Sequence, residues 1–152
     1  MRVALASDHA GFQLKDEFSA ALARMGHVVL DLGTDSAAVS VDYPDFGVAV
    51  ARAVVDGKAD LGVAVCGSGN GIAIAANKVA GARAAVVHDV TSARLAREHN
   101  DANVMAIGAR FIGGQTALDA LRAFLVAGFE GGRHVARVAK LDAAASVGKG
   151  DA

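Results

Sequence analysis

The chain contains one cysteine and one proline among its 152 residues, and long apolar runs are missing. A single cysteine cannot form an internal disulfide, which is typical of proteins in a reducing compartment. No apolar run approaches the roughly 20 residues of a membrane-spanning helix. The start, Met1-Arg-Val-Ala-Leu-Ala6, lacks the apolar stretch and cleavage site of a signal peptide. We therefore expect a cytoplasmic protein that has no membrane partner.

An excess of either charge is also missing, because the formal net charge is −1. No dense stripe of lysine and arginine with interleaved aromatic residues occurs, so we expect no nucleic-acid partner. The apolar share of 53% excludes a disordered chain. Without a linker or repeat, this length predicts a single domain over residues 1–145, followed by a small, polar, flexible tail over residues 146–152.

Short apolar runs alternate with helical patterns along the chain. We expect strands at residues 2–6, 27–32, 61–65, 82–87 and 103–107. We expect helices at residues 12–25, 44–55, 72–77, 91–99, 116–126 and 133–145. Five strands separated by helices predict a parallel sheet that is covered by helices on both faces, which is an α/β fold.

In such sheets, ligands bind beyond the carboxyl ends of the strands. Four of the expected strands end in polar or glycine-rich segments, namely Asp8-His9, Cys66–Gly71, His88-Asp89 and Gly108–Arg110. Because these segments are independent of one another, their convergence on one edge predicts a ligand site there.

The segment that suggests most chemistry is Val65-Cys66-Gly67-Ser68-Gly69-Asn70-Gly71. A strand, a glycine-rich turn and a helix start together direct free backbone N–H groups at one point, which favours an anion such as a phosphate or an enolate. A thiol beside that helix start is stabilised as its thiolate and becomes a usable base or nucleophile. The simpler interpretation makes Cys66 a small buried residue, the glycines a tight turn and Ser68 a helix N-cap.

Known phosphate-binding patterns do not fit this segment. A phosphatase loop needs Cys-x5-Arg, but the sixth residue after Cys66 is Ile72. The Walker Gly-Lys-Ser/Thr is missing, and the third glycine comes one residue too early for the dinucleotide pattern.

Other polar residues allow two interpretations each. Asp8-His9 is either a cap on the first helix or a clamp for sugar hydroxyls, and Tyr43 either contacts a ligand or belongs to a helix cap. Adding His88-Asp89 suggests a metal, but no His-x3-His spacing or similar ligand pattern occurs, so we expect no metal.

The segment His99-Asn100-Asp101 falls between a helix and a strand, at the opposite edge of the predicted sheet. The simple interpretation is a histidine on a helix C-terminus. If His99 is catalytic, it acts in a neighbouring subunit's site, which predicts an oligomer. Arg133 and Arg137 are four residues apart and are either solvated or form a phosphate clamp.

Taken together, these segments resemble type B ribose-5-phosphate isomerase and its relatives that isomerise galactose 6-phosphate, allose 6-phosphate and tetrose phosphates. The resemblance runs from the first strand to about Lys140. It is carried by Ser7-Asp8-His9-Ala-Gly-Phe12, Asp42-Tyr43-Pro44-Asp45, Cys66-Gly-Ser-Gly-Asn-Gly-Ile72, Ala75-Ala-Asn-Lys78, Arg97-Glu-His-Asn-Asp101, Gly108-Ala-Arg110 and Gly131-Gly-Arg-His134.

The resemblance implies a Rossmann-like three-layer α/β/α sandwich and a role for each matching residue. Cys66 matches the base that moves a proton between C1 and C2, and Gly67–Gly71 match the anion hole. Ser68 matches a residue that assists at the substrate oxygens, and His99 matches the residue that opens the furanose ring. One branch of the family uses a glutamate where this chain has Ile72, which leaves Cys66 as the base.

The remaining matches concern binding. The resemblance implies sugar or phosphate contacts for Asp8, His9 and Asn100, a position near the pocket for Tyr43, and phosphate ligation by Arg110, Arg133 and Arg137. It also implies a homodimer or tetramer with shared sites and no cofactor. The expected reaction converts ribose 5-phosphate to ribulose 5-phosphate through a cis-enediol(ate), in the pentose phosphate pathway. Two alternatives are another sugar phosphate and a non-catalytic sugar-phosphate-binding module.

Overall fold

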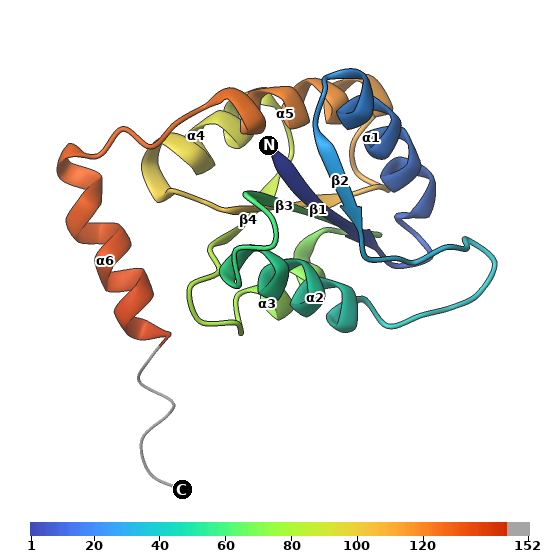
Figure 1. Ribbon diagram of the computed structural model, residues 1–152, viewed down its shortest axis with the longest axis horizontal. Coiled ribbons are helices and arrows are strands. Elements are labelled where there is room, and N and C mark those ends of the chain that lie inside the picture. Colours follow the sequence, from blue (N-terminus) through green and yellow to red (C-terminus); the bar gives the residue numbers. More distant parts are fainter. Residues whose placement is uncertain (146–152) are drawn as a thin grey trace, which may run out of the picture.

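The computed structural model describes residues 1–145, and the tail expected to be flexible (residues 146–152) lies outside the described residues. Strands and helices alternate as the sequence predicts (Figure 1). The strands are β1 (Arg2–Ser7), β2 (Val28–Asp31), β3 (Leu61–Cys66), β4 (Ala84–Val87) and β5 (Val104–Gly108). The helices are α1 (Phe12–Arg24), α2 (Tyr43–Val55), α3 (Asn70–Ala76), α4 (Val90–Asn100), α5 (Gly114–Val126), the 3₁₀ turn η1 (Gly132–His134) and α6 (Val135–Ala144).

All strand pairs are parallel, and the sheet order is β2-β1-β3-β5-β4. After β1 the chain adds β2 on one side and all later strands on the other. The strand order therefore reverses between β1 and β3, and a crevice forms beyond the carboxyl ends of these two strands. β4 does not pair with β3, because β5 lies between them. β4 consequently lies at the edge of the sheet.

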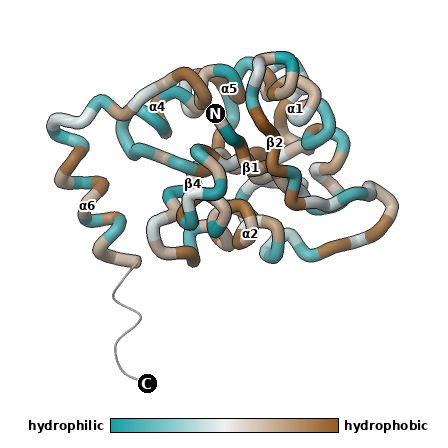
Figure 2. Tube along the Cα trace, viewed as in Figure 1, coloured by the Kyte–Doolittle hydropathy of each residue, from teal (hydrophilic) through white to brown (hydrophobic). Residues whose placement is uncertain are grey.

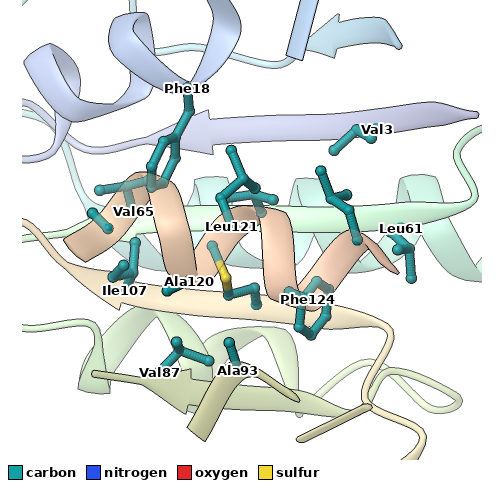
Figure 3. Packing of buried hydrophobic residues seen from close by; sticks show 14 of the residues in the cluster. Val3, Phe18, Leu61, Val65, Val87, Ala93, Ile107, Ala120, Leu121 and Phe124 are labelled. Carbon is teal, nitrogen blue, oxygen red and sulfur yellow. The ribbon is translucent and has the colours of Figure 1, made fainter. Parts of the chain in front are cut away.

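Helices cover both faces of the sheet, which confirms the three-layer α/β/α fold. Alternation along β1 directs Val3 and Leu5 into one core cluster, with residues of α1, α4 and α5. Figure 3 shows Phe18 of α1 with Leu121 and Phe124 of α5 in this cluster. The opposite face packs against α2 and α3. Burying these apolar side chains is the main source of stability for such a fold.

Small residues bring α2 and α3 close together. A Cβ atom on Gly47 of α2 would stand 2.6 Å from the carbonyl oxygen of Ile72 in α3. It would also stand 3.2 Å from the Cβ atom of Ala75. Since this contact involves backbone on both sides, Gly47 sets the distance between the two helices.

Helix α6 lies apart from the two helical layers, at the left of Figure 1. Hydrophilic and hydrophobic stretches alternate along it (Figure 2). Its Asp142 accepts a hydrogen bond from Arg83 at 3.0 Å, and Arg83 also donates to the Asp101 carboxylate at 2.8 Å. Within residues 1–145, no helix has both the length and the apolar character needed to cross a membrane.

Candidate active site

A pocket of about 380 Å³ lies beyond the carboxyl ends of β1, β3 and β5. Its size is within the range of small-molecule sites. We call it the loop pocket, and its lining residues are Asp8, His9, Ala10, Tyr43, Cys66, Gly67, Ser68, Gly71, Arg110 and Phe111. The predicted convergence of separate strand ends is therefore confirmed for three of the four segments.

Cys66 is the last residue of β3, and its side chain is almost fully buried at the base of the loop pocket. Its Sγ atom accepts a hydrogen bond from the backbone N–H of Gly69 at 3.1 Å. An N–H that is directed at sulfur stabilises negative charge there. The sulfur therefore has a hydrogen-bond donor directed at it and lines the pocket, although the residue is also buried as the simpler interpretation requires.

Glycine is required at two positions of the turn after Cys66. Gly69 has a φ of +80°, and a Cβ atom there would stand 2.9 Å from the backbone nitrogen of Gly108. A Cβ atom on Gly71 would stand 2.5 Å from the ring of Tyr43. The turn is thus held tightly between β5 and α2, which fixes the direction of its N–H groups.

Ser68 lines the loop pocket, but it does not cap the following helix. The N-cap of α3 is Gly69, so the simpler of the two interpretations, in which Ser68 is the N-cap, was wrong. The reason is that the turn reaches helical geometry one residue later, after the left-handed Gly69. The Ser68 hydroxyl oxygen accepts the N–H of Asn70 at 3.3 Å, which leaves the hydroxyl proton free to be donated to a ligand.

Asp8 and His9 line the loop pocket, and neither is the N-cap of α1, which is Gly11. The buried carboxylate of Asp8 accepts the N–H of Gly11 at 2.9 Å, at the start of α1, and Asp8 also lines the loop pocket. The Nδ1 atom of His9 accepts the N–H of Val41 at 3.2 Å. In the neutral ring the proton therefore resides on Nε2, which makes His9 a donor to a ligand.

Arg110 supplies positive charge to the loop pocket. Its backbone N–H donates to the carbonyl oxygen of Gly67 at 3.1 Å, and its guanidinium lies 3.5 Å from the position of a Cβ atom on Gly67. The guanidinium of Arg110 and the glycine turn thus lie next to each other within one chain. Next to it, Phe111 lines the pocket while remaining largely exposed. The sequence reasoning missed Phe111 and Ala10, which could have been found as neighbours of the predicted site residues.

His88 and Asp89 lie outside the loop pocket because β4 is the edge strand. Asp89 is the N-cap of α4 and accepts the N–H of Ser92 at 2.6 Å. This backbone hydrogen bond, with a smaller contribution from the Ser92 hydroxyl, lowers the pKa of the Asp89 carboxyl. Asp89 therefore stabilises the start of α4 as its N-cap.

Four predicted site residues lie away from the loop pocket of their own chain, namely His99, Asn100, Arg133 and Arg137. His99 and Asn100 end α4, while Arg133 and Arg137 are exposed on η1 and α6. The expected placement of His99 at the opposite edge is confirmed. Gly69 and Asn70 contribute to the turn, through the hydrogen bonds given above, without lining the pocket.

His99 is part of a compact group of side chains that we call the histidine cluster, formed with Glu130 and His134. The rings of His99 and His134 stack with their centroids 4.3 Å apart and their planes at 10°. A Glu130 carboxylate oxygen lies 3.9 Å from the Nε2 atom of each ring. Neither Glu130 nor His134 was predicted as a site residue, although His134 ends the segment Gly131-Gly-Arg-His134 that carries part of the resemblance.

His134 is buried, and burial lowers its pKa; the nearby His99, Arg133 and Arg137 lower it further, while Glu130 partly opposes them. Arg133 Nε also donates to His134 Nε2 at 3.4 Å, which requires a neutral acceptor nitrogen. His134 is therefore uncharged near neutral pH.

Among residues 1–145, one group of at least three histidine, cysteine or acidic side chains is close enough together to hold a metal ion, and it is the histidine cluster. Its ligand atoms lie within 4.8 Å of one another. The rings are nearly parallel, however, so their in-plane lone pairs run side by side instead of converging on one point. The stacking geometry therefore does not favour a metal.

Comparison with known proteins gives a consistent result. A family model described as Ribose/Galactose Isomerase matches residues 3–141. Ribose-5-phosphate isomerase B of Escherichia coli is 46% identical over 142 residues, which are 93% of this chain and 95% of that protein. D-erythrulose-4-phosphate isomerase of Pectobacterium atrosepticum is 40% identical over 141 residues, 93% of each chain. The solved structure of ribose-5-phosphate isomerase B from Clostridium thermocellum has 48% identity and a TM-score of 0.96, and the match covers 98% of this chain and 100% of that one.

Proposed function

The chain belongs to the ribose/galactose isomerase family, and we propose that it interconverts ribose 5-phosphate and ribulose 5-phosphate without a metal or cofactor. It is an aldose–ketose isomerase, that is, an intramolecular oxidoreductase. The observation that supports the proposal most is the Cys66 thiol at the base of a pocket lined by Ser68 and by the positively charged Arg110.

Proton transfer between C2 and C1 is the central step. The Cys66 thiolate removes the C2 proton of the open-chain aldose, and the electrons move through C2=C1 onto O1, which gives an enediolate. Backbone N–H groups of the Gly67–Gly71 turn stabilise the negative oxygen, at about 3–4 kcal/mol for each well-placed donor. Ser68 assists transfer of the O2 proton to O1, and Cys66 returns its proton to C1 as C2=O2 forms. The product has the same atoms as the substrate.

The remaining groups bind the substrate and open its ring. We assign sugar hydroxyls to Asp8, His9 and Tyr43, and phosphate ligation to Arg110 together with Arg133 and Arg137. His99 protonates the ring oxygen, and Asn100 contacts the sugar. Because His99, Asn100 and the last two arginines lie outside the loop pocket, a second copy of the chain supplies them, in a homodimer or tetramer. We place the enzyme in the cytoplasm and in the non-oxidative pentose phosphate pathway.

The second candidate function is the same chemistry on a sugar phosphate of another length. It is favoured by a relative named D-erythrulose-4-phosphate isomerase, which shares 40% identity. A phosphate clamp and a C1–C2 base suit four-, five- and six-carbon substrates equally. A non-catalytic binding module is disfavoured because it needs arginines but no buried thiol that is held by a backbone N–H.

The test is ketose formation from ribose 5-phosphate by the purified protein in EDTA. Four- and six-carbon aldose phosphates are assayed alongside. Turnover of ribose 5-phosphate that survives chelation supports the proposal. Turnover confined to another chain length supports the second candidate, and loss of activity in EDTA that added metal restores would overturn the metal-free mechanism.

A further inference from the structure

We propose that Glu130 and His134 are positioning residues that hold the His99 ring in the orientation needed for opening the sugar ring. This inference rests on the proposed function, because it concerns the step that precedes isomerisation. Neither residue is assigned to substrate contact by the mechanism above. Both act through His99, which is the group that donates the proton.

The backbone fixes Glu130 beside the end of α4. Its N–H donates to the carbonyl oxygen of Glu98 at 3.0 Å, next to His99 in the chain. Arg97, in the same helical turn, donates from Nε to the carbonyl oxygen of Ala127 at 3.3 Å. The segment before η1 is thus tied to α4 by two hydrogen bonds, and these hold the Glu130 carboxylate 3.9 Å from the His99 Nε2 atom.

The two stacked rings differ in burial and in hydrogen bonding. Stacked rings at 4.3 Å cannot both be cationic without strong repulsion. His134 is the ring that stays neutral, because it is buried and accepts a hydrogen bond from Arg133. Other charged groups nearby are Arg137 on α6 and Glu98 on α4, and the Glu98 carboxylate is paired with Arg94.

Glu130 is therefore the carboxylate that faces the Nε2 atom of His99, while His134 supplies a flat neutral surface that fixes the plane of the His99 ring. Ring opening uses both properties. The C1–O4 bond of the furanose breaks, and its electron pair and the His99 proton go to O4. The anomeric O1–H releases its proton to solvent as C1=O1 forms, and solvent restores the proton on His99.

A comparison of two substrates tests this proposal. Ribose 5-phosphate must be opened first, whereas erythrose 4-phosphate has no free hydroxyl that can close a five-membered ring on C1. We expect Glu130→Gln and His134→Gln to lower kcat on ribose 5-phosphate about tenfold, a part of the ~10²–10⁴ that a proton-transfer group contributes. Activity on erythrose 4-phosphate should be little changed. The matched control is Glu98→Gln, because that carboxylate faces Arg94.

Equal losses on both substrates would overturn the proposal, because a role in folding or phosphate binding affects them alike. Unchanged activity on both would also overturn it. Absence of ribose 5-phosphate turnover in the unsubstituted protein would instead reject the proposed function itself.

A second measurement is independent of C2 chemistry. In Cys66→Ala protein, NMR exchange spectroscopy follows the interconversion of the α- and β-furanose forms of ribose 5-phosphate, which requires ring opening. We expect Glu130→Gln or His134→Gln, added to Cys66→Ala, to slow this exchange towards the rate without enzyme. An exchange rate equal to that of Cys66→Ala alone would overturn the proposal.

Discussion

The loop pocket and the histidine cluster hold their functional groups in different ways. In the loop pocket, the backbone does the positioning: β3 ends at Cys66, and the N–H of Gly69 is directed at the sulfur. In the histidine cluster, side chains position one another through a ring stack and a shared carboxylate. Substitutions in the glycine turn therefore disturb the backbone of the loop pocket. Substitutions in the histidine cluster can remove a single charge and leave the backbone in place.

The two regions also differ in completeness. The loop pocket brings the glycine turn, the proposed base Cys66 and one arginine together within a single chain. The histidine cluster carries ionisable groups on a different edge of the sheet, with Arg133 and Arg137 exposed nearby. Under the proposed function, each chain carries two halves of a site, and these halves meet between copies.

The largest expected effect is on the base. Cys66→Ala should lower kcat by about 10²–10⁴, the contribution of a positioned base, while binding of ribose 5-phosphate persists. Steady-state kinetics and calorimetric titration with the sugar phosphate measure the two quantities. The control is Cys66→Ser, which retains a polar group of similar size but a far weaker base. Turnover close to that of the unsubstituted protein in Cys66→Ala would rule out the assignment of the base.

Mixing two inactive variants tests whether the sites are shared. Cys66→Ala and His99→Gln chains, denatured and refolded together, should regain activity, because a mixed dimer combines an intact Cys66 from one chain with an intact His99 from the other. Statistical pairing gives one intact site in half of the dimers, so recovery should reach about a quarter of normal activity. Each variant refolded alone is the control, and no recovery in the mixture would show that each site is built within one chain.

A smaller effect is expected where the turn meets Tyr43. Gly71→Ala places a Cβ atom 2.5 Å from the Tyr43 ring, so the free energy of unfolding should fall by about 1–3 kcal/mol, as for other overpacked sites. Chemical denaturation measures this change. The matched control is Gly113→Ala, where no atom lies within 4 Å of the added Cβ. Equal stability of the two variants would contradict the tight packing of the turn.

The smallest expected effect concerns pH. Burial lowers the pKa of His134 in the folded protein below its ordinary value of 6.5. The unfolded chain therefore binds more protons than the folded one as the pH falls below that value, and stability decreases on acidification. In His134→Gln the fall in Tm between pH 7 and pH 5 should be shallower, whereas His27→Gln serves as a control at a histidine outside the cluster. An identical fall in His134→Gln and the unsubstituted protein would contradict this.

Much of the fold was predictable because it follows from local patterns. Apolar runs located every strand of residues 1–145, and the alternation of strands and helices gave the parallel sheet. The final helix was predicted as one piece from residue 133, but it begins with the 3₁₀ turn η1. Helical spacing alone does not distinguish the two, since the difference is one of hydrogen bonding at the first turn.

Most of the loop pocket was predictable because strand ends carry it. Cys66, Asp8 and Arg110 follow strands, so they could be placed at the correct edge from sequence. His88 follows a strand too, yet it is excluded because the strand order places β4 at the edge of the sheet, and order depends on tertiary packing. Glu130 could not be found, since its contact with His99 joins segments that are separate in the sequence.

The contact at Gly47 determines how far α2 and α3 can approach each other beside the loop pocket. Helix α2 carries Tyr43 at its first turn, α3 begins at the end of the glycine turn, and Gly47 spaces these two helices with no room to spare. The distance between the two helices is therefore set by a contact that lies outside the pocket. A larger side chain at this position would increase that distance and tilt Tyr43 away from the turn. The length of sugar that fits can thus be adjusted at a residue that lies outside the pocket lining.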